Sequence, residues 1–574
     1  MRKKGHKYIF VVGGVMSGVG KGIATSSIAK ILQAKGFKIN PIKIDPYLNV
    51  DAGTMNPTEH GEAFVLRSGL ECDQDMGNYE RFLDTDLRSE DYITSGMVYQ
   101  SVIDRERNLG YKGKCVEAIP HIRDEIVYRI ERAAHLNHSD ISVIEVGGTV
   151  GDYQNIMFIE AARVMKARNP DDVAFIMVSY LPVPSTLGEM KTRPTQHAVQ
   201  MLNSYGVQTD IVIGRSNQPL DRKRKEKIAN QCNLDVKRVI SAPDVDSIYD
   251  IPLDFEKAGL DDVIFDVLRI RSKRKSNLTK WREFASSSKK LKDEVKIAIV
   301  GKYFDTGNFV LSDAYISVIE AIKYSSYKYK ASPKLYWLNA KDFERGKAKT
   351  ATLSQYDGII VPGGFGETGI EGKLAVIKYA REHKIPYFGL CYGMQLATIE
   401  YARDVIRLKD ANTHEIDPKA KHLIVDIMPE QKHLLAKKQY GATMRLGSYP
   451  AKLEKGTMAE KLYGTNKTEE RHRHRYEINP EYIERLERAG MIFSGRSPDG
   501  KLMEILELPK DVHPFFMGTQ FHPELQARPL RPHPLFNGFI KACLAVHADP
   551  VIKQGGKRGA LQPKKRTAAR AKKA

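Results

Sequence analysis

Short apolar runs alternate with amphipathic stretches along most of the chain. Residues 8–12, 141–146, 173–179 and 210–213 are typical of buried strands, and so are residues 295–300, 358–361 and 387–390 further on. Strands that alternate with helices favour parallel sheets covered by helices. The pattern therefore predicts an α/β protein with two domains, each a mainly parallel sheet flanked by helices.

A polar segment separates the two series of strands. It extends over about residues 271–294, contains RSKRKSN and SSSKKLKDE, and has many charges and few apolar residues. We therefore predict a first domain at 1–275, a linker at 276–294 and a second domain at 295–550. A tail at 551–574 follows.

The composition is that of a soluble globular protein, with 574 residues, 42% hydrophobic and 28% charged. No apolar run approaches the roughly 18 residues of a membrane span. The N-terminus is basic, but the apolar run after it breaks at Gly13-Gly14 without a cleavage site, so we expect no secretory signal. Five scattered cysteines without CxxC argue against a disulfide framework or a zinc site and predict a cytoplasmic protein.

The formal net charge of +20 at first suggests nucleic acid as a partner. Nine of the lysines and arginines lie in residues 553–574, which contain no acid, and without them the charge is +11. This composition predicts a disordered tail. The tail is either a solubilising appendage or a contact for a polyanion or partner. The remaining positive charge also suits an enzyme that handles nucleotide phosphates.

A glycine-rich loop joins the first predicted strand to a helix. The run YIFVV leads into GGVMSGVGKGIATSS, after which apolar residues follow helical spacing. In this context glycines let backbone N–H groups point at phosphate oxygens, and the helix N-terminus and Lys21 add positive charge. A tight turn without a ligand is the alternative, but the context favours nucleotide binding.

The loop departs from the common phosphate-binding pattern. Five residues separate Gly14 from Gly20, and Gly22 follows Lys21 where the common pattern places a Ser or Thr that binds Mg²⁺. Another group must then hold the metal, and carboxylates are the natural hard ligands. The candidates are Asp73, Asp75 and Glu145. A carboxylate at the carboxyl end of a parallel strand faces the ligand crevice.

A cysteine lies at a sharp strand-to-helix turn in the second half. Cys391 stands in Gly-Leu-Cys-Tyr-Gly, which reads as a nucleophile elbow with Cys in place of Ser. The glycines permit the turn, and the helix N-terminus favours the thiolate. A cysteine without partners would more often be an inert buried residue.

Two other segments supply what a cysteine nucleophile needs. PGGFG, at residues 362–366, follows a predicted strand and can direct N–H groups at an oxyanion. His522 follows another apolar run and can act as the general base, with Glu524 orienting it. The combination predicts a catalytic set of Cys391, His522 and Glu524.

These motifs resemble the two halves of one family. PGGFG, GLCYGMQ and QFHPE resemble the class I, triad-type glutamine amidotransferases. GGVMSGVGKG, KIDPYLNVDAGTM, HGEAFV, GNYERF, KTRPTQH and DVDSIY resemble the synthetase domain of the CTP synthases, a P-loop-type domain. That family fuses the two halves in this order. The resemblance extends from about residue 8 to about residue 548 and leaves out the tail.

The resemblance implies a reaction. Glutamine is hydrolysed in the second domain, ATP phosphorylates O4 of UTP in the first, and ammonia displaces the phosphate to give CTP. The ammonia passes between the domains through an internal channel. The resemblance also implies Mg²⁺, activation by GTP, feedback inhibition by CTP, and homodimers that form homotetramers. It implies no membrane partner.

The resemblance assigns residues to the nucleotides. The ATP-binding residues are Gly18, Val19, Gly20, Lys21, Gly22, Ile23, Asp75 and Val245, and the Mg²⁺ ligands are Asp75 and Glu145. Lys43 resembles a lysine beside the phosphates, and Asp244 belongs with Val245. The UTP and CTP residues are Ser17, Asp152, Tyr153, Gln154, Lys191, Thr192, Arg193, Pro194, Thr195, Gln196 and Lys227. Without the resemblance, Lys227 in DRKRKEK is typical of a solvated basic face.

The resemblance also assigns a glutamine pocket. Its residues are Gly364, Tyr392, Gly393, Met394, Gln395, Glu415 and Arg475. Glu415 suits the ammonium group of glutamine, and Arg475 suits the carboxylate. His60 resembles a residue of the ammonia path, and Arg445 lies in a segment that resembles a lid tied to GTP activation. Without the resemblance, RHRHR at 471–475 indicates a charged surface run.

Three segments depart from the family pattern. Residues 152–154 read Asp-Tyr-Gln where many members carry Asp-Ile-Glu, which bears on CTP affinity rather than on the reaction. Pro243 replaces a common basic residue, and residues 180–184 also differ. None of these changes the predicted catalytic or metal-binding residues.

Two other interpretations stay open on the sequence. One is a different P-loop amidotransferase that amidates a carboxylate. The other is an inactive, assembly-forming or nucleic-acid-binding protein. KTRPTQH and Lys227 favour a nucleoside triphosphate over the first, and the complete set of Cys391, His522 and Glu524 argues against the second.

Overall fold

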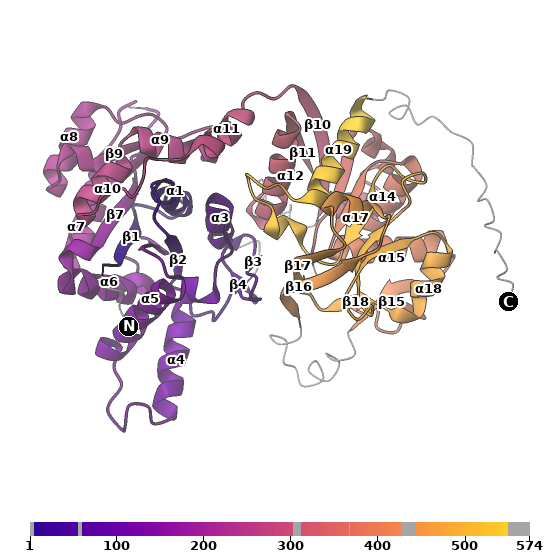
Figure 1. Ribbon diagram of the computed structural model, residues 1–574, viewed down its shortest axis with the longest axis horizontal. Coiled ribbons are helices and arrows are strands. Elements are labelled where there is room, and N and C mark those ends of the chain that lie inside the picture. The colour runs from indigo at the N-terminus through magenta and orange to yellow at the C-terminus, as the bar shows by residue number, and fades with distance from the viewer. Residues whose placement is uncertain are drawn as a thin grey trace.

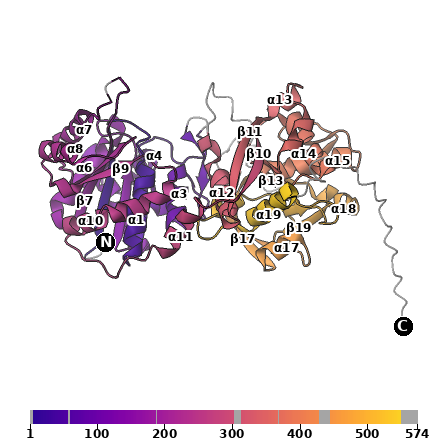
Figure 2. The ribbon, with the colours of Figure 1, turned by 90° about the horizontal axis from the view of Figure 1, so that it is seen from above.

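The computed structural model describes residues 5–55, 60–186, 188–301, 312–364, 366, 368–427 and 444–548. Within these ranges, two large sheets covered by helices lie next to each other along the long axis of the molecule (Figures 1 and 2). The predicted α/β fold with two domains is confirmed. The predicted tail at 551–574 lies outside the described residues.

The first sheet has seven parallel strands in the order β5-β2-β6-β1-β7-β8-β9. Their bounds are β1 Lys7–Gly14, β2 Ile39–Asp45, β5 Tyr92–Thr94, β6 Ile141–Val146, β7 Val173–Tyr180, β8 Ile211–Ser216 and β9 Val239–Pro243. A separate hairpin pairs β3 Phe64–Val65 with β4 Glu71–Cys72. Because the seven strands run in one direction, the loops that follow them meet at one edge and can form one binding crevice.

Helices cover both faces of this sheet. They are α1 Lys21–Ala34, α3 Gln74–Leu83, α4 Ser95–Arg107, α5 Arg123–Leu136, α6 Ile156–Arg168, α7 Arg193–Ser204, α8 Arg222–Cys232, α9 Ile251–Lys257 and α10 Leu260–Leu268. Ile9 and Val11 of β1 pack in a cluster with α1, α9 and α10, whereas Phe10 and Val12 pack in a cluster with α5 and α6. Burial on both faces explains why the strand reads as a continuous apolar run.

The second sheet has nine strands in the order β11-β10-β12-β13-β21-β20-β19-β16-β17. Their bounds are β10 Asp293–Gly301, β11 Ala331–Asn339, β12 Gly358–Val361, β13 Tyr387–Leu390, β16 Arg445–Leu453, β17 Lys467–His474, β19 Ile492–Arg496, β20 Met503–Glu507 and β21 Phe516–Thr519. The five strands from β11 to β21 are parallel, and the other four pairings are antiparallel. The parallel half matches the prediction, and the antiparallel extension adds to it.

The remaining elements of the second domain enclose this sheet. A small sheet is made of β14 Ala411–Thr413, β15 His422–Ile427 and β18 Tyr476–Ile478. The helices are α12 Ile316–Lys328, α13 Ala340–Glu344, α14 Ile370–His383, α15 Tyr392–Asp404, α17 Met458–Tyr463, α18 Pro480–Arg488 and α19 Pro534–Ala548. Helices α12 and α19 share a core cluster with one face of the sheet, and α14 and α15 share one with the other.

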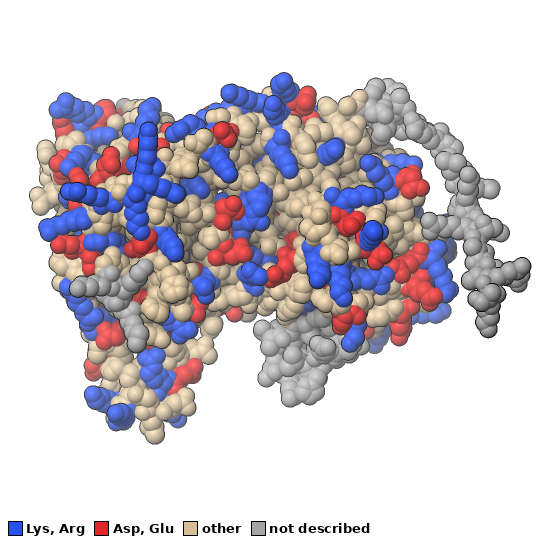
Figure 3. All heavy atoms as spheres, in the orientation of Figure 1, with Lys and Arg blue, Asp and Glu red and all other residues tan. Residues whose placement is uncertain are grey.

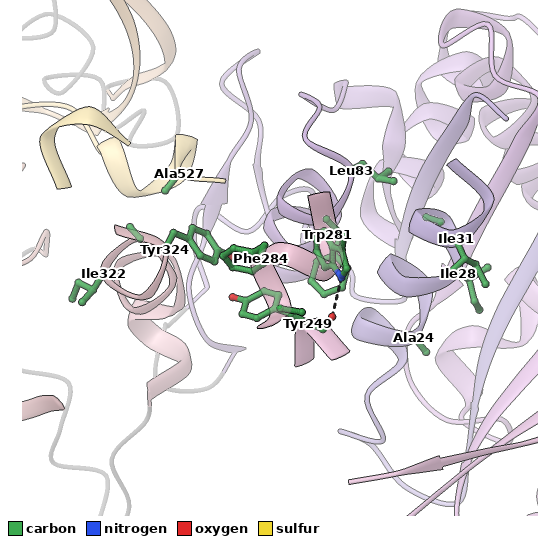
Figure 4. Packing of buried hydrophobic residues seen from close by; sticks show 14 of the residues in the cluster. Ala24, Ile28, Ile31, Leu83, Tyr249, Trp281, Phe284, Ile322, Tyr324 and Ala527 are labelled. Atoms are coloured by element: carbon green, nitrogen blue, oxygen red, sulfur yellow. Dashed lines mark hydrogen bonds between the residues drawn. The ribbon is translucent and has the colours of Figure 1, made fainter. Parts of the chain in front are cut away.

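The predicted linker contains a packed helix, α11 Thr279–Ser287. Trp281 is buried, and its Nε1 donates to the carbonyl oxygen of Tyr249 at 2.8 Å. Phe284 contacts Trp281 and Tyr249 on one side and Tyr324 of α12 on the other, so a row of rings connects the two domains (Figure 4). The few apolar residues of the polar segment thus join the two domain cores.

We expect Trp281→Ala to lower the free energy of unfolding by about 3–5 kcal/mol, because it leaves a cavity in this row of rings. Calorimetric or urea-induced unfolding measures the change. Trp337→Ala is the control, since the ring of Trp337 in β11 is only partly buried. An equal loss of stability in both variants would contradict the role given to Trp281.

On the face seen in Figure 3, basic side chains are spread over both domains with acidic side chains between them. They do not gather in a single stripe on that face. Among the described residues, no helix has the length and apolar character needed to cross a membrane.

Candidate active sites

The glycine-rich loop connects β1 to α1 at the carboxyl edge of the first sheet. Gly18 and Gly20 have positive φ angles of 70° and 85°, and Gly20 is the N-cap of α1. Lys21 Nζ donates to the carbonyl oxygen of Gly148 at 2.9 Å, in the loop that follows β6. A Cβ atom at Gly13 would lie 2.9 Å from this ammonium group. The loop therefore needs glycine both for its turns and for the approach of Lys21.

Gly22 explains why the loop lacks the usual hydroxyl residue. A Cβ atom at position 22 would lie 1.9 Å from Oδ1 of Asp75. The carboxylate therefore occupies the space that a Ser or Thr side chain would fill. Asp75 lies in the first turn of α3, and Asp73 caps that helix by accepting from the Asp75 N–H at 2.8 Å.

Four carboxylates surround Lys43 at the ends of β2, β6 and α3. Lys43 Nζ donates to Asp75 Oδ2 at 2.6 Å and to Glu145 Oε1 at 2.9 Å, and lies 3.7 Å from Asp45 and from Asp73. Burial disfavours the charged lysine, but the carboxylates outweigh burial and raise its pKa. Burial raises the pKa of Asp73 to about 7. The predicted metal ligands Asp75 and Glu145 thus converge on the ammonium group of Lys43.

This donor set fits a magnesium ion that is bound together with a nucleotide. Mg²⁺ prefers oxygen ligands and usually uses one or two carboxylates plus substrate phosphates. Asp75 and Glu145 each place one carboxylate oxygen on the ammonium group of Lys43, beside the glycine loop, so the two oxygens are close enough together to bind one metal ion. Among the described residues, no group of three or more His, Cys, Asp or Glu side chains is arranged as a metal site by itself. A metal here would therefore need phosphate oxygens as further ligands.

A small cavity lies on the other side of the glycine loop. It is lined by Gly20, Ala24, Ile213, Arg215, Ser241, Ala242, Pro243, Val245, Ile251, Asp254 and Phe255. The predicted ATP residues Gly20 and Val245 therefore meet here, together with Pro243, while Val19 and Ile23 pack toward the core. Arg215 pairs with Asp244 at 2.6 Å, and a Cβ atom at Gly20 would touch the guanidinium group of Arg215. No motif pointed to Arg215.

The residues predicted for the pyrimidine nucleotide lie on the same edge of the sheet. Ser17 is exposed on the glycine loop, and Tyr153 and Gln154 are exposed after β6. Asp152 accepts from the Thr149 N–H at 2.6 Å. Lys191 pairs with Glu189 at 2.6 Å, and Lys191, Arg224 and Lys227 together lower the pKa of this exposed carboxyl group. Lys191 and Lys227 thus both lie near the carboxylate of Glu189.

The start of α7 completes this segment. Arg193 is exposed and Pro194 lies in the first turn. Thr195 and Ser179 share a buried hydrogen bond of 2.8 Å between their hydroxyl groups, and Gln196 donates to the Thr192 hydroxyl at 3.1 Å. The buried members fix α7 against β7, which leaves Lys191 and Arg193 as the side chains able to meet a phosphate.

The predicted cysteine elbow is present between β13 and α15. Cys391 has φ 49° and ψ −96° and precedes the first residue of the helix. A Cβ atom at Gly389 would lie 2.6 Å from the backbone of Gly393, and one at Gly393 would lie 2.2 Å from the carbonyl oxygen of Val361. These two glycines therefore allow the sharp turn. Strained backbone of this kind is a feature of nucleophile elbows.

Strands β12, β13 and β21 are neighbours and bring the other predicted groups to Cys391. Gly363 follows β12, and a Cβ atom there would lie 2.8 Å from the His522 ring. His522 Nδ1 and Glu524 Oε1 are hydrogen-bonded at 2.7 Å. Burial disfavours the imidazolium, but Glu524 and then Cys391 outweigh burial and raise the pKa of His522 to about 10. This is the arrangement that a cysteine nucleophile with a histidine base requires.

We expect Glu524→Gln to lower the pKa of His522 from about 10 toward its ordinary value of 6.5. Because the folded-state pKa is raised, the stability that His522 contributes is complete below about pH 6.5. It is lost as the pH rises to about 10. The variant should flatten this part of the stability profile. NMR titration of the imidazole measures the pKa, and Glu469→Gln, at an exposed carboxylate, should leave it unchanged. An unchanged pKa in Glu524→Gln would contradict the assignment.

A cavity of about 310 Å³ lies in front of Cys391, between the two domains. From the first domain it is lined by Gly53, Thr54, Met55, Glu62 and Ala63, and from the second by residues that include Gly363, Gly364, Cys391, Glu415, Met444, Arg473, Arg475, His522 and Glu524. The predicted glutamine residues Gly364, Glu415 and Arg475 therefore share this cavity with the nucleophile. Glu415 accepts from the Gly366 N–H at 2.7 Å.

The other predicted glutamine residues lie in the first turn of α15, behind the elbow. Met394 is buried in the core, and Gln395 Nε2 donates to the carbonyl oxygen of Tyr476 at 2.9 Å. The Tyr392 hydroxyl donates to the carbonyl oxygen of Gly366 at 3.4 Å. None of the four predicted residues at 392–395 lines the cavity. His60 does not line this cavity and instead contacts the Tyr47 ring on the first domain.

The interpretation of residues 471–475 as a charged surface run, which the sequence indicates without the resemblance, was wrong. Arg471, His472 and His474 are buried in β17. The strand alternation places Arg471 and Arg473 toward the first domain, where Arg473 pairs with Glu71 at 2.7 Å. The alternation of arginine and histidine has the period of two that a strand gives, but it does not show that side chains on both faces are buried. Arg445 is also buried, paired with Glu504 at 2.8 Å.

Comparisons with known proteins agree with this two-site arrangement. Residues 7–270 match the family model of the CTP synthase N-terminus, and residues 310–542 match that of the class-I glutamine amidotransferases. The chain is 49% identical over 538 residues to the CTP synthase of Thermococcus gammatolerans, which covers 93% of this chain and 98% of that protein. It is 46% identical over 539 residues to the CTP synthase of Bacillus licheniformis, with 94% and 98% covered.

A solved structure of the Trypanosoma brucei CTPS glutaminase domain with bound acivicin is also similar. It is 34% identical, covers 44% of this chain and 94% of that one, and has a TM-score of 0.40. The two family models together cover most of the chain, and the full-length relatives match nearly all of it. The chain therefore belongs to the CTP synthase family.

Proposed function

We propose that this chain makes CTP by ATP-dependent amination of UTP, with ammonia from glutamine. The observation that carries the proposal is the shared cavity. Cys391, His522 and Glu524 open onto a space whose other wall belongs to the first domain. Ammonia released at Cys391 therefore enters a space between the domains rather than bulk water, which favours the neutral, nucleophilic form.

Glutamine hydrolysis follows from the second domain's own groups. Glu415 and Arg475 carry charges opposite to those of the glutamine ammonium and carboxylate groups. The Cys391 thiolate attacks the side-chain amide carbon, and the His522 imidazolium donates a proton to the departing nitrogen. The resulting thioester is hydrolysed by water, with His522 accepting the proton. Glu524 holds the His522 ring throughout, and glutamate leaves.

The first domain supplies the activation of UTP. ATP binds with its phosphates on the glycine loop, where the α1 N-terminus and Lys21 balance negative charge. Asp75 and Glu145 would hold Mg²⁺, which when bound would supply positive charge beside the transferring phosphoryl group. Lys191, Arg193 and Lys227 hold the UTP triphosphate, which leaves O4 of the uracil to be phosphorylated. Ammonia then attacks C4, and phosphate leaves with its oxygen.

Regulation and assembly are part of the same proposal. GTP activates hydrolysis through the segment that contains Arg445, and CTP inhibits by binding at residues 152–154. Homodimers assemble into homotetramers in the cytoplasm. The exposed apolar residues Tyr99, Ile103 and Tyr128 on α4 and α5 support a contact with a second copy. The basic tail is not required for the reaction.

The test is a reaction with purified components. Protein is mixed with UTP, ATP, Mg²⁺, glutamine and GTP, and nucleotides are separated by chromatography while glutamate is measured. CTP, ADP and glutamate in equal amounts support the proposal. Suppose that glutamate is released from glutamine but that no CTP forms with either glutamine or ammonium as the nitrogen source. That result would keep the amidotransferase half of the proposal and reject UTP as the acceptor.

A further inference from the structure

Helix α3 extends from the ATP site to the second domain. It lies on the side of the first domain that faces α12 in both views of the ribbon (Figures 1 and 2). Its first turn carries Asp75, which lies against Gly22 of the glycine loop. One turn later, the Tyr79 hydroxyl donates to Glu145. The N-terminal half of α3 therefore touches both predicted metal ligands and the ATP loop.

The next residue of α3 binds two arginines of the second domain. Glu80 is fully buried. Its carboxylate accepts from Arg471 at 2.8 and 3.2 Å and from Arg528 at 2.6 Å. Asp86 pairs with the same two arginines at 2.9 and 3.2 Å, but its side chain is 41% exposed. Glu80 is thus the buried counter-charge of both guanidinium groups, and breaking such a pair from one side is strongly unfavourable.

The two arginines flank the segment that carries the catalytic histidine. The His522 N–H donates to the carbonyl oxygen of Arg471 at 2.8 Å. Arg528 donates to the carbonyl oxygen of Leu525 at 2.9 Å, and the Leu525 N–H donates to the carbonyl oxygen of His522 at 3.1 Å. One carboxylate of the first domain, Glu80, therefore anchors both sides of the turn from His522 to Leu525.

A second chain of hydrogen bonds leaves the same helix. Asn78 donates to Asp75 at 3.3 Å and accepts from Arg81 at 3.1 Å. Arg81 donates in turn to the Ser317 hydroxyl of α12 at 3.1 Å, and the Ser317 N–H donates to Glu62 at 3.2 Å. Glu62 lines the cavity in front of Cys391. Two routes from Asp75 thus reach the glutaminase site through consecutive residues of α3.

We propose that Glu80 is a positioning residue for glutamine hydrolysis, and that α3 couples occupancy of the ATP site to the rate of that hydrolysis. A nucleotide bound at Asp75 and Glu145 acts on the first turns of α3. A small shift of this helix moves Arg471 and Arg528, and with them the backbone that orients His522. The inference rests on the proposed function, since it requires ATP at the N-terminal end of α3.

Glu80→Gln in the full-length protein tests the proposal. Glutamate release is measured with and without ATP, UTP and Mg²⁺, and CTP formation is measured with ammonium. We expect the stimulation of glutaminase kcat by nucleotides to fall about tenfold or more, since small misplacements of catalytic groups have large effects. The KM for glutamine and the ammonium-dependent rate should change by less than about twofold. Glu80→Asp, which keeps the charge, should restore part of the stimulation.

Arg67→Gln is the matched control. Arg67 pairs with Glu469 across the same domain boundary at 2.8 Å, but both side chains are largely exposed and neither touches the turn from His522 to Leu525. Its nucleotide stimulation should stay as in the wild type. If Glu80→Gln does not fold, Arg528→Lys and Asn78→Ala each weaken one of the two routes and should lower the stimulation in part.

Two results would overturn the proposal, and a third would contradict the proposed function instead. A folded Glu80→Gln protein with full nucleotide stimulation would overturn the proposal. So would an equal fall of the glutamine-dependent and ammonium-dependent rates, because that is the result of a purely structural role. Failure of the wild type to make CTP from ammonium would instead contradict the proposed function, independently of α3.

Discussion

Cys391→Ala is expected to abolish CTP formation from glutamine and to leave CTP formation from ammonium. The variant removes the nucleophile, and loss of such a residue typically lowers kcat by about 10³-fold or more. Alanine keeps the Cβ atom, so it adds no strain at φ 49°. The Sγ atom makes long contacts of 3.7 Å with the carbonyl oxygen of Arg473 and with Gln520, and it also interacts with the His522 ring. The fold should therefore tolerate the change.

The ratio of the two CTP-forming activities is the measured quantity. Cys543→Ala is a suitable control, because Cys543 is a buried core residue of α19 outside the cavity. It should lower stability without changing the ratio. Glutamine-dependent CTP formation that survives in Cys391→Ala would show that another group carries out the hydrolysis.

Gly22→Ala is expected to lower CTP formation from both nitrogen sources by about 100-fold. The new Cβ atom would lie 1.9 Å from Asp75 Oδ1, and this carboxylate is held by Lys43 at 2.6 Å. Asp75 must therefore move, and a displacement of about 1 Å at a catalytic site can cost 10²-fold in rate. Glutamine hydrolysis without nucleotides should change little, because Cys391 lies in the other domain.

The two activities are measured by CTP chromatography and by glutamate release. Gly259→Ala provides the control, since nothing lies within 4 Å of a Cβ atom there, although its φ of 72° is positive, unlike that of the helical Gly22. The control variant therefore adds a backbone strain of about 1–2 kcal/mol that Gly22→Ala does not have, and it should still form CTP normally because position 259 is not in the glycine loop. Normal CTP formation by Gly22→Ala would contradict the tight packing of Asp75 on the loop.

The sequence predicted the parts of the fold that follow simple patterns. Strands such as β1 and β7 are buried on both faces and read as continuous apolar runs. The antiparallel strands β16 and β17 escaped prediction because their buried side chains include Arg445, Arg471 and His472. Polar residues enter the interior there as ion pairs, and no local pattern shows which acid will meet them.

The candidate sites also contain residues whose arrangement the sequence predicted and residues whose arrangement it did not. The elbow glycines and Cys391 form one local motif, and His522 and Glu524 form another, so their meeting was predictable. The role of Gly22 was predictable only in part, since the missing hydroxyl indicated a carboxylate but not that Asp75 would fill the space. The link from Glu80 to Arg471 joins residues 391 positions apart. Such contacts depend on how two domains pack, which neither motif encodes.

The most direct test of the account follows the amide nitrogen of glutamine. Protein, UTP, ATP, Mg²⁺ and GTP are incubated with amide-¹⁵N-labelled glutamine in a buffer that contains unlabelled ammonium, and CTP is examined by mass spectrometry. We expect CTP whose amino group carries ¹⁵N, because ammonia from Cys391 reaches UTP through the space between the domains. Absence of CTP, from glutamine and from ammonium alike, in folded protein would contradict the account.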